Sequence, residues 1–241
     1  RQSSGNVIST YAEDPLFGNL HDLPGKAWHQ TIMSRAQAEA PGVTTLVDNS
    51  KRVSWCASLL ENDSLEVHPL LLLRDPRALM RFWQLRYTSA KKVRRQRTRH
   101  SLMAPGQALK LLTCSTRELY LRKWLIRNQQ ATRLLERSGR PANFVTYHDL
   151  ASDPERALRR LMPLLGLDYE PEQLRYGEAE QKGTLKTEYQ SASSASQISL
   201  DVRWQTDLSA EDAKAATEFA ALNTYLESHG LTFSSNGLTM H

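Results

Sequence analysis

The amino-acid sequence predicts an α/β fold in which a parallel β-sheet is flanked by helices. Short apolar segments at residues 44–48, 69–75 and 142–150 have the length and composition of buried strands. Amphipathic segments typical of helices lie between and after them, as in a parallel sheet whose strands are joined by helical crossovers. We expect a single domain of residues 1–241, because a chain of this length can form one sizeable core.

The predicted helices have recognisable ends. In Arg74-Asp75-Pro76-Arg77, Asp75 can cap a helix whose first position is Pro76. Asp153 with Pro154 and Ser209 with the acidic residues after it repeat this pattern, and Gly139 follows the longest helical segment. These signals predict helices at residues 54–60, 76–87, 115–139, 153–167 and 209–230.

Composition limits the class of protein. The chain has 40% apolar and 24% charged residues, as expected for a globular protein, and no apolar run long enough to form a transmembrane helix. Its two cysteines, Cys56 and Cys114, provide neither a disulfide framework nor a metal site, so we expect no metal and a cytoplasmic location. The net charge of +5 favours an anionic partner.

The strand predicted at residues 69–75 ends at a turn that contains two arginines, Arg74 and Arg77. Helix N-termini attract anions through their free N–H groups. Arg74 and Arg77 beside such an end predict an anion site, and the alternative is that they only solvate the end of the strand.

Four segments in this order resemble the sulfotransferases that use 3′-phosphoadenosine 5′-phosphosulfate, in their bacterial form. The family has a strand ending in V-D-S-S-K, a strand ending in L-V-R-D-P-R, a W-x-x-x-N helix, an R-Y-E-D-L…D-P…L-G-L segment and a late I-x-x-D-x-x-W…L-S. The similar segments here are VDNSK (47–51) with VHPLLLLRDPR (67–77), WLIRN (124–128), VTYHDLASDPERALRRLMPLLGL (145–167) and ISLDVRWQTDLS (198–209).

This resemblance implies a P-loop NTPase-like sulfotransferase fold and the phosphosulfate compound as co-substrate. In the family, the first arginine of R-D-P-R binds the 3′-phosphate, which assigns that role to Arg74. A serine that usually assists it is replaced here by Phe82. Lys182, Gly183 and Lys186 lie where the family has a late phosphate-binding loop, although the spacing differs and a solvated loop is the alternative.

The N-terminal part departs from the family. The first strand and the glycine-containing phosphosulfate loop have no counterpart, so we expect them to precede residue 1. The catalytic base is therefore unassigned, since Asn6, at the position of a family glutamate, cannot accept a proton. His68, Glu13 and Lys51 are weak catalytic candidates.

Residues 88–108 contain a basic cluster, KKVRRQRTRH, which we expect to be a variable loop over the acceptor. Lys91, Lys92, Arg94 and Arg95 would attract an anionic small-molecule or glycan acceptor. The alternative is a solvated, mobile loop. Nucleic acid is not expected as a partner, because no aromatic platform or known nucleic-acid-binding motif accompanies the cluster.

Two classes of function follow. The first is a sulfotransferase acting on a hydroxyl or amine by in-line displacement. The second is a non-catalytic relative that binds a nucleotide or polyanion, suggested by Phe82, Asn6 and the missing loop.

Overall fold

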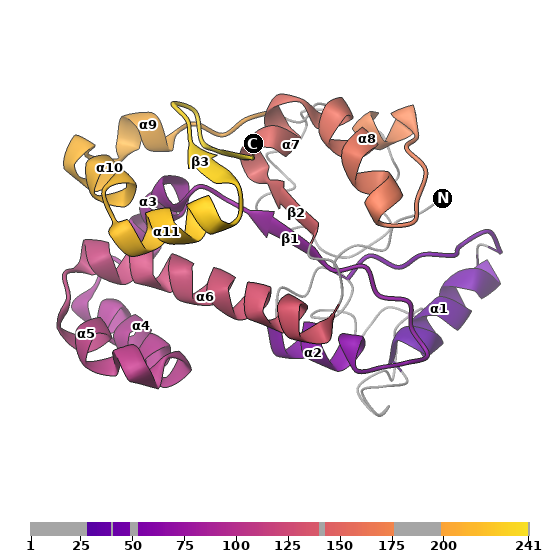
Figure 1. Ribbon diagram of the computed structural model, residues 1–241, viewed down its shortest axis with the longest axis horizontal. Helices are drawn as coiled ribbons and strands as arrows, with labels where there is room; N and C mark the ends of the chain where they lie inside the picture. Colours follow the sequence, from indigo (N-terminus) through magenta and orange to yellow (C-terminus); the bar gives the residue numbers. More distant parts are fainter. Residues whose placement is uncertain (1–27, 40, 49–52, 140–142, 176–198, 241) are drawn as a thin grey trace. The chain divides into compact units, whose positions relative to one another are not determined.

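The computed structural model describes residues 28–39, 41–48, 53–139, 143–175 and 199–240 (Figure 1). Contacts divide the chain into two compact units, one formed by residues 1–67 and 175–197 and the other by residues 68–174 and 198–241. Each unit is described by itself. The single domain predicted for residues 1–241 stays a prediction.

The described part of the first unit is helical. Its helices are α1 (Trp28–Glu39) and α2 (Val53–Leu60), and α2 confirms the helix predicted at residues 54–60. The strand predicted at residues 44–48 is wrong: these residues have no regular secondary structure. A strand needs hydrogen bonds from a neighbouring strand, and no described residue forms a ladder with this segment.

A parallel pair of strands lies in the second unit. β1 (Leu70–Leu73) pairs with β2 (Asn143–Thr146), with Leu70 opposite Asn143 and Leu73 opposite Thr146, which confirms the strand predicted at residues 69–75 and the parallel direction. The strand predicted at residues 142–150 is confirmed only in its first half, because residues 147–150 are helical: the Thr146 side chain accepts a hydrogen bond from the backbone N–H of Asp149 and begins a helix there. Alternate residues of a strand point to opposite faces. Leu73 is accordingly buried, whereas Leu70 and Leu72 are 42% and 52% exposed, so β1 is buried on one face and not on both.

Helices with the predicted caps follow each strand. After β1 comes α3 (Pro76–Arg86), and after β2 come α7 (Tyr147–Ser152) and α8 (Pro154–Leu164). Asp75 accepts a hydrogen bond from the backbone N–H of Arg77, and Asp153 accepts one from Arg156. The longest helix, α6 (Thr116–Ser138), ends at Gly139, whose φ of 66° suits glycine.

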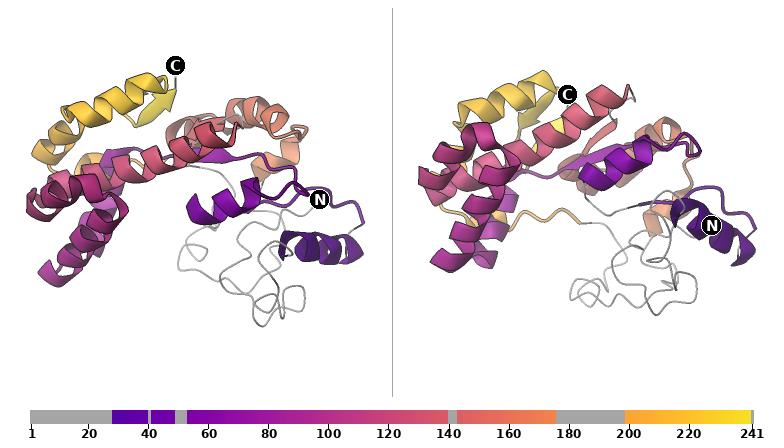
Figure 2. Two further views of the ribbon diagram at one scale, coloured as in Figure 1. Left: turned by 60° about the horizontal axis from the view of Figure 1, so that its bottom comes forward. Right: turned by 90° about the horizontal axis from the view of Figure 1, so that it is seen from below.

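The basic segment forms a helix, so the loop predicted at residues 88–108 is wrong for most of its length. α4 (Ala90–Met103) begins at the cap Ser89 and is followed by a short 3-10 helix, η2 (Pro105–Gln107), and by α5 (Ala108–Thr113). Lysine, arginine and glutamine are good helix formers, and no glycine or proline interrupts the segment. Helices α4 and α5 pack against each other, and α4 also contacts α6 (Figures 1 and 2).

The C-terminal part contains more separate helices and strands than the sequence predicted. The helix expected at residues 209–230 breaks near Phe219 into two, and a hairpin that the sequence did not suggest follows them. The elements are η3 (Pro171–Arg175), α9 (Trp204–Asp207), α10 (Ala210–Thr217), α11 (Ala220–Ser228), β3 (Leu231–Phe233) and β4 (Leu238–Met240). The described structure is thus mostly helical with a small parallel sheet, an α/β arrangement, and the finer P-loop NTPase-like sulfotransferase fold stays a prediction.

Helix α6 is central to the core of the second unit. Trp124 and Tyr120 on α6 share one buried cluster with Leu73 of β1, Met80 of α3 and Leu222 of α11. The helices α3 and α11 both contact α6 (Figure 1). The end of β1 is therefore fixed by packing on a long helix. Among the described residues, none of the helices has the length and apolar character required to cross a bilayer.

One charged side chain lies inside this core. Lys123 of α6 is 1% exposed, and its Nζ lies 4.1 Å from the centre of the Trp83 ring. The Nζ also donates to Gln96 Oε1 at 3.1 Å and to the Tyr87 hydroxyl at 3.3 Å. Burial, with a smaller effect from nearby arginines, lowers the pKa of Lys123 from 10.5 to about 7.

This pKa predicts that stability rises between pH 7 and pH 9. In that range the unfolded lysine stays protonated while the folded one loses its proton, so the unfolded state binds more protons and the free energy of unfolding increases with pH. Urea unfolding across this range should show a smaller increase for Lys123→Met than for the parent. The exposed Lys214→Met is the control and should keep the parent's slope. Parallel curves for all three proteins would contradict a lowered lysine pKa.

Candidate functional site

The candidate site lies where β1 turns into α3. Arg74 follows the last residue of β1, and Pro76 is the first residue of α3. Only Arg74 and Asp75 therefore connect the strand to the helix. In parallel sheets the carboxyl ends of the strands are where ligands usually bind. The two arginines of this turn have different surroundings.

Arg77 is buried, and its Nε and Nη2 are bound within the protein. Its Nε and Nη2 donate to the Asp75 carboxylate, with Nη2 2.7 Å from Oδ2, and Nη2 also donates to the Ser234 carbonyl at 2.9 Å. The guanidinium lies 4.1 Å from the centre of the Trp204 ring and 4.8 Å from that of Phe233. The prediction that Arg77 helps to bind an anion is therefore wrong, because its donors are used to join α3 to the C-terminal hairpin.

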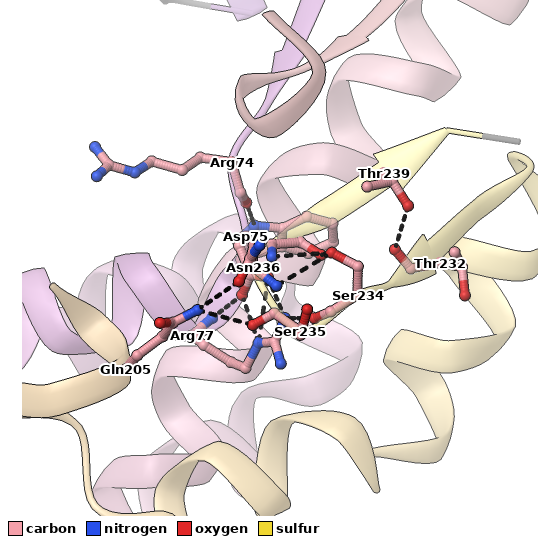
Figure 3. A network of polar contacts seen from close by, with 11 residues as sticks. Arg74, Asp75, Arg77, Gln205, Thr232, Ser234, Ser235, Asn236 and Thr239 are labelled. Atoms are coloured by element: carbon pink, nitrogen blue, oxygen red, sulfur yellow. Dashed lines mark hydrogen bonds and ion pairs between the residues drawn. The ribbon is translucent and has the colours of Figure 1, made fainter. Parts of the chain in front are cut away.

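Arg74 points away from this network. Figure 3 shows its side chain extending from the strand end on the side opposite to Asp75, Arg77 and Ser234. Its Nη2 donates to Asp201 at 2.9 Å, and its guanidinium lies 4.7 Å from the centre of the Tyr147 ring. The side chain is 37% exposed. The Nε–H is nevertheless buried and has no hydrogen-bond partner among the described residues.

Asp201 holds two guanidinium groups together. Besides Arg74, it receives hydrogen bonds from Arg203, at 2.8 Å to each carboxylate oxygen. The backbone N–H of Asp201 donates to the Tyr147 hydroxyl at 3.0 Å, which fixes this loop to the start of α7. The Arg203 hydrogen bonds, with a smaller effect from the charge of Arg74, keep the pKa of Asp201 well below its ordinary value. The carboxylate therefore stays ionised and orients Arg74 at all ordinary pH values.

Residues from three later segments of the family resemblance contact this turn. Trp124 Nε1 on α6 donates to the Arg74 carbonyl at 2.8 Å, and Asn128 donates to the Trp124 carbonyl at 2.9 Å. Trp204 is buried against Arg77. The tryptophan of the W-x-x-x-N segment and the aspartate and tryptophan of the D-x-x-W segment thus contact the arginines of the Arg-Asp-Pro-Arg turn.

Several predicted site residues are not part of this arrangement. Lys91, Lys92, Arg94 and Arg95 are all exposed on α4. Phe82 is 36% exposed on α3 beside Arg86. His68 is exposed, with its ring beside Gly166. The remaining candidates, Glu13, Lys51, Lys182, Gly183 and Lys186, lie outside the described residues.

Sequence reasoning missed two contributors to the site, Tyr147 and Arg203. Tyr147 directly follows β2, so its place next to the end of β1 follows from the parallel pairing of the strands. Arg203 stands two residues after Asp201, within the late segment that resembles the family. The pairing of Arg74 with Asp201 joins residues 127 positions apart, and no local sequence signal reveals it.

A second polar arrangement, also missed, lies in the first unit. Asp48 Oδ2 lies 3.0 Å from His29 Nε2 and accepts a hydrogen bond from Trp55 Nε1 at 2.6 Å. The His29 Nδ1 is buried without a hydrogen-bond partner among the described residues. A carboxylate that orients an imidazole is the arrangement found behind many general bases. The Asp48 carboxylate also contributes to raising the pKa of the Cys56 thiol, after the larger effect of burial.

Comparison with known proteins gives a limited result. No protein-family model and no curated protein matches the chain. Among solved structures, the chain is similar to the "Sulfotransferase Domain from the Curacin Biosynthetic Pathway", with a TM-score of 0.43 and 18% identity, over 85% of this chain and 77% of that one. A similarity of this size carries no argument about function, which has to come from the contacts of the residues themselves.

The contrast between the two arginines predicts different losses of stability. Arg77→Met leaves the Asp75 carboxylate buried without its cation and should cost about 3 kcal/mol of unfolding free energy. Arg74→Met removes a partly exposed ion pair and should cost less than about 1 kcal/mol. Urea unfolding of both variants measures the difference. Equal losses would show that Arg77 does not have the structural role described.

Proposed function

We propose that the chain is a sulfotransferase that moves a sulfuryl group from 3′-phosphoadenosine 5′-phosphosulfate to a hydroxyl or amine acceptor. The observation that carries the proposal is the state of Arg74. It lies at the carboxyl end of a parallel strand, is held by an ionised carboxylate, and has a buried Nε–H without a partner among the described residues. Leaving a buried donor unpaired is costly, so a ligand oxygen is the natural partner for it.

The surroundings of Arg74 suit a phosphate. A guanidinium can give two parallel N–H groups to two phosphate oxygens. Asp201 accepts from Nη2 of Arg74, while the Nε–H on the same edge of the guanidinium has no partner among the described residues and can donate to a ligand oxygen. Arg203 supplies a second guanidinium on the same carboxylate. By resemblance to the family, Arg74 would bind the 3′-phosphate, with Lys182, Gly183 and Lys186 as further candidates for the phosphate site.

The chemistry of the transfer sets the remaining requirements. The acceptor oxygen or nitrogen has to align with the S–O bond that breaks, a base has to take its proton, and positive charge has to stabilise the leaving phosphate oxygen. His68, Glu13 and Lys51 remain candidates for the catalytic groups. The proposed acceptor is a small molecule or glycan, with Lys91, Lys92, Arg94 and Arg95 as the groups that attract it if it is anionic.

One observation favours a non-catalytic alternative, in which the chain binds a nucleotide or polyanion without transferring a group. Where the family usually has a serine that assists the phosphate-binding arginine, this chain has a partly exposed phenylalanine, Phe82. A transfer assay separates the two functions. Incubation with ³⁵S-labelled donor and a panel of hydroxyl and amine acceptors should give labelled product for an enzyme. Binding of 3′-phosphoadenosine 5′-phosphate without any product would support the alternative.

Arg74→Ala should weaken the binding of 3′-phosphoadenosine 5′-phosphate at least roughly tenfold. The variant loses a charge-assisted contact worth about 1.5–3 kcal/mol. Isothermal titration calorimetry measures the change. Arg81→Ala is the matched control, since Arg81 lies on α3 and pairs with Asp207 outside the candidate site, and its affinity should match the parent's. Unchanged affinity in a folded Arg74→Ala variant would remove the main support for the donor site.

A further inference from the structure

A cavity lies at the C-terminal end of α3, whereas the Arg74 turn lies at its N-terminal end. Its volume is about 780 Å³, within the usual range for small-molecule sites, and its walls come from the last turn of α3, the residue after it and one face of α4. Four cations, Arg86, Lys92, Arg95 and Arg99, line it together with Tyr87 and Gln96. The α4 residues 92, 95, 96 and 99 follow the i, i+3, i+4, i+7 spacing of a single helix face.

These four cations have no counter-charge within the part of the chain that the structure describes. None of them forms an ion pair with a carboxylate among the described residues, although other arginines nearby do, such as Arg122 with Glu118 at 2.7 Å. Helix α4 itself contains no acidic residue. Lys92 Nζ is held 3.5 Å from the Arg86 carbonyl, which places the charges of α3 and α4 on the same cavity. Such an arrangement produces a strong positive potential in a concave site.

The cavity floor, formed by Gln96 and Tyr87, is held by hydrogen bonds to α6. Gln96 is 7% exposed, and its Oε1 accepts a hydrogen bond from the buried Lys123 amine, which also donates to the Tyr87 hydroxyl. Both floor residues are thereby fixed by contacts to α6. The charges of Arg99 and Arg86 contribute, after burial, to the lowered pKa of Lys123, as expected where cations lack counter-charges. Two of the residues that line the cavity are therefore held in place by α6, and the four cations surround them from α3 and α4.

We propose that this cavity binds a compact polyanion that carries two or more phosphate or sulfate groups. Lys92 and Arg99 are separated by about 10 Å along α4, at 1.5 Å per residue. A single phosphate is too small to contact both ends of that row, whereas two or more linked anionic groups can do so. Four cations with a buried polar floor suit such a ligand better than a monoanion.

The site is distinct from the one at Arg74. The helix α3 between them has 11 residues, which places its two ends about 15 Å apart. Arg86 and Arg99 belong to the cavity although the sequence did not single them out, whereas Lys91 and Arg94 do not line it. The inference does not rest on sulfuryl transfer, and it stands if the chain proves to have no transferase activity.

Calorimetric titration of the full chain with inorganic triphosphate tests the proposal. The parent should bind triphosphate at least tenfold more tightly than inorganic phosphate at about physiological ionic strength. The double variant Arg95→Gln/Arg99→Gln should bind triphosphate at least tenfold more weakly. The control, Arg133→Gln/Arg137→Gln, removes the same charge from exposed positions of α6 that do not line the cavity, and it should lose less than threefold.

Two results would overturn the proposal: equal losses in the two double variants, which indicate a diffuse electrostatic attraction, or equal binding of triphosphate and phosphate. A measurement on the parent alone guards against misfolded variants. Triphosphate should protect Arg95 and Arg99, but not Arg94, from modification by phenylglyoxal, as read by mass spectrometry. Uniform protection, or none, would contradict the assignment of the ligand to this cavity.

Discussion

The buried ion pair between Arg77 and Asp75 is the constraint on which the second unit depends. The pair closes the turn from β1 to α3, caps the helix through the same carboxylate, and joins both to the C-terminal hairpin through the Ser234 carbonyl. The rings of Trp204 and Phe233 lie beside the guanidinium, and both members of the pair are largely buried. Burying one charge alone would be very costly. The buried pair therefore helps to hold the turn and the hairpin together, and Gln205 of α9 adds hydrogen bonds to Ser235 and Asn236 (Figure 3).

This constraint separates the roles of the two arginines. Because Arg77 and Asp75 satisfy each other inside the protein, neither is available to a ligand. Arg74, three residues earlier, leaves the strand on the other side, where Tyr147 and Asp201 hold it. Its carbonyl is fixed by Trp124, so the backbone of the turn is also anchored to α6. The same short segment thus contains one arginine bound within the protein and one, Arg74, that the proposed function assigns to a ligand.

The parts of the fold that could be predicted from sequence are those with local causes. The cap of α3 at Asp75, the glycine at the end of α6 and the apolar segments of β1 and β2 depend on neighbouring residues, and all were confirmed. The dense positive charge of α4 is typical of a solvated loop, but its residues have good helix propensity and Ser89 caps the helix. The partners of Arg74 and Arg77 could not be derived at all, since Asp201 and Ser234 lie more than a hundred positions away. The resemblance to sulfotransferases drew the prediction of an anion site to this turn, but it did not tell which arginine was buried.

The central claim is that Arg74 receives an anionic ligand while Arg77 is locked in the protein interior. Nuclear magnetic resonance of the arginine Nε–H groups in the ¹⁵N-labelled chain tests it directly, with the signals assigned by an Arg74→Lys variant. On addition of 3′-phosphoadenosine 5′-phosphate, the Arg74 signal should shift and saturate, because its buried Nε–H gains a partner, while the Arg77 signal should stay in place and exchange slowly with water. A stationary Arg74 signal at saturating ligand, or a shift of the Arg77 signal in its place, would contradict the account.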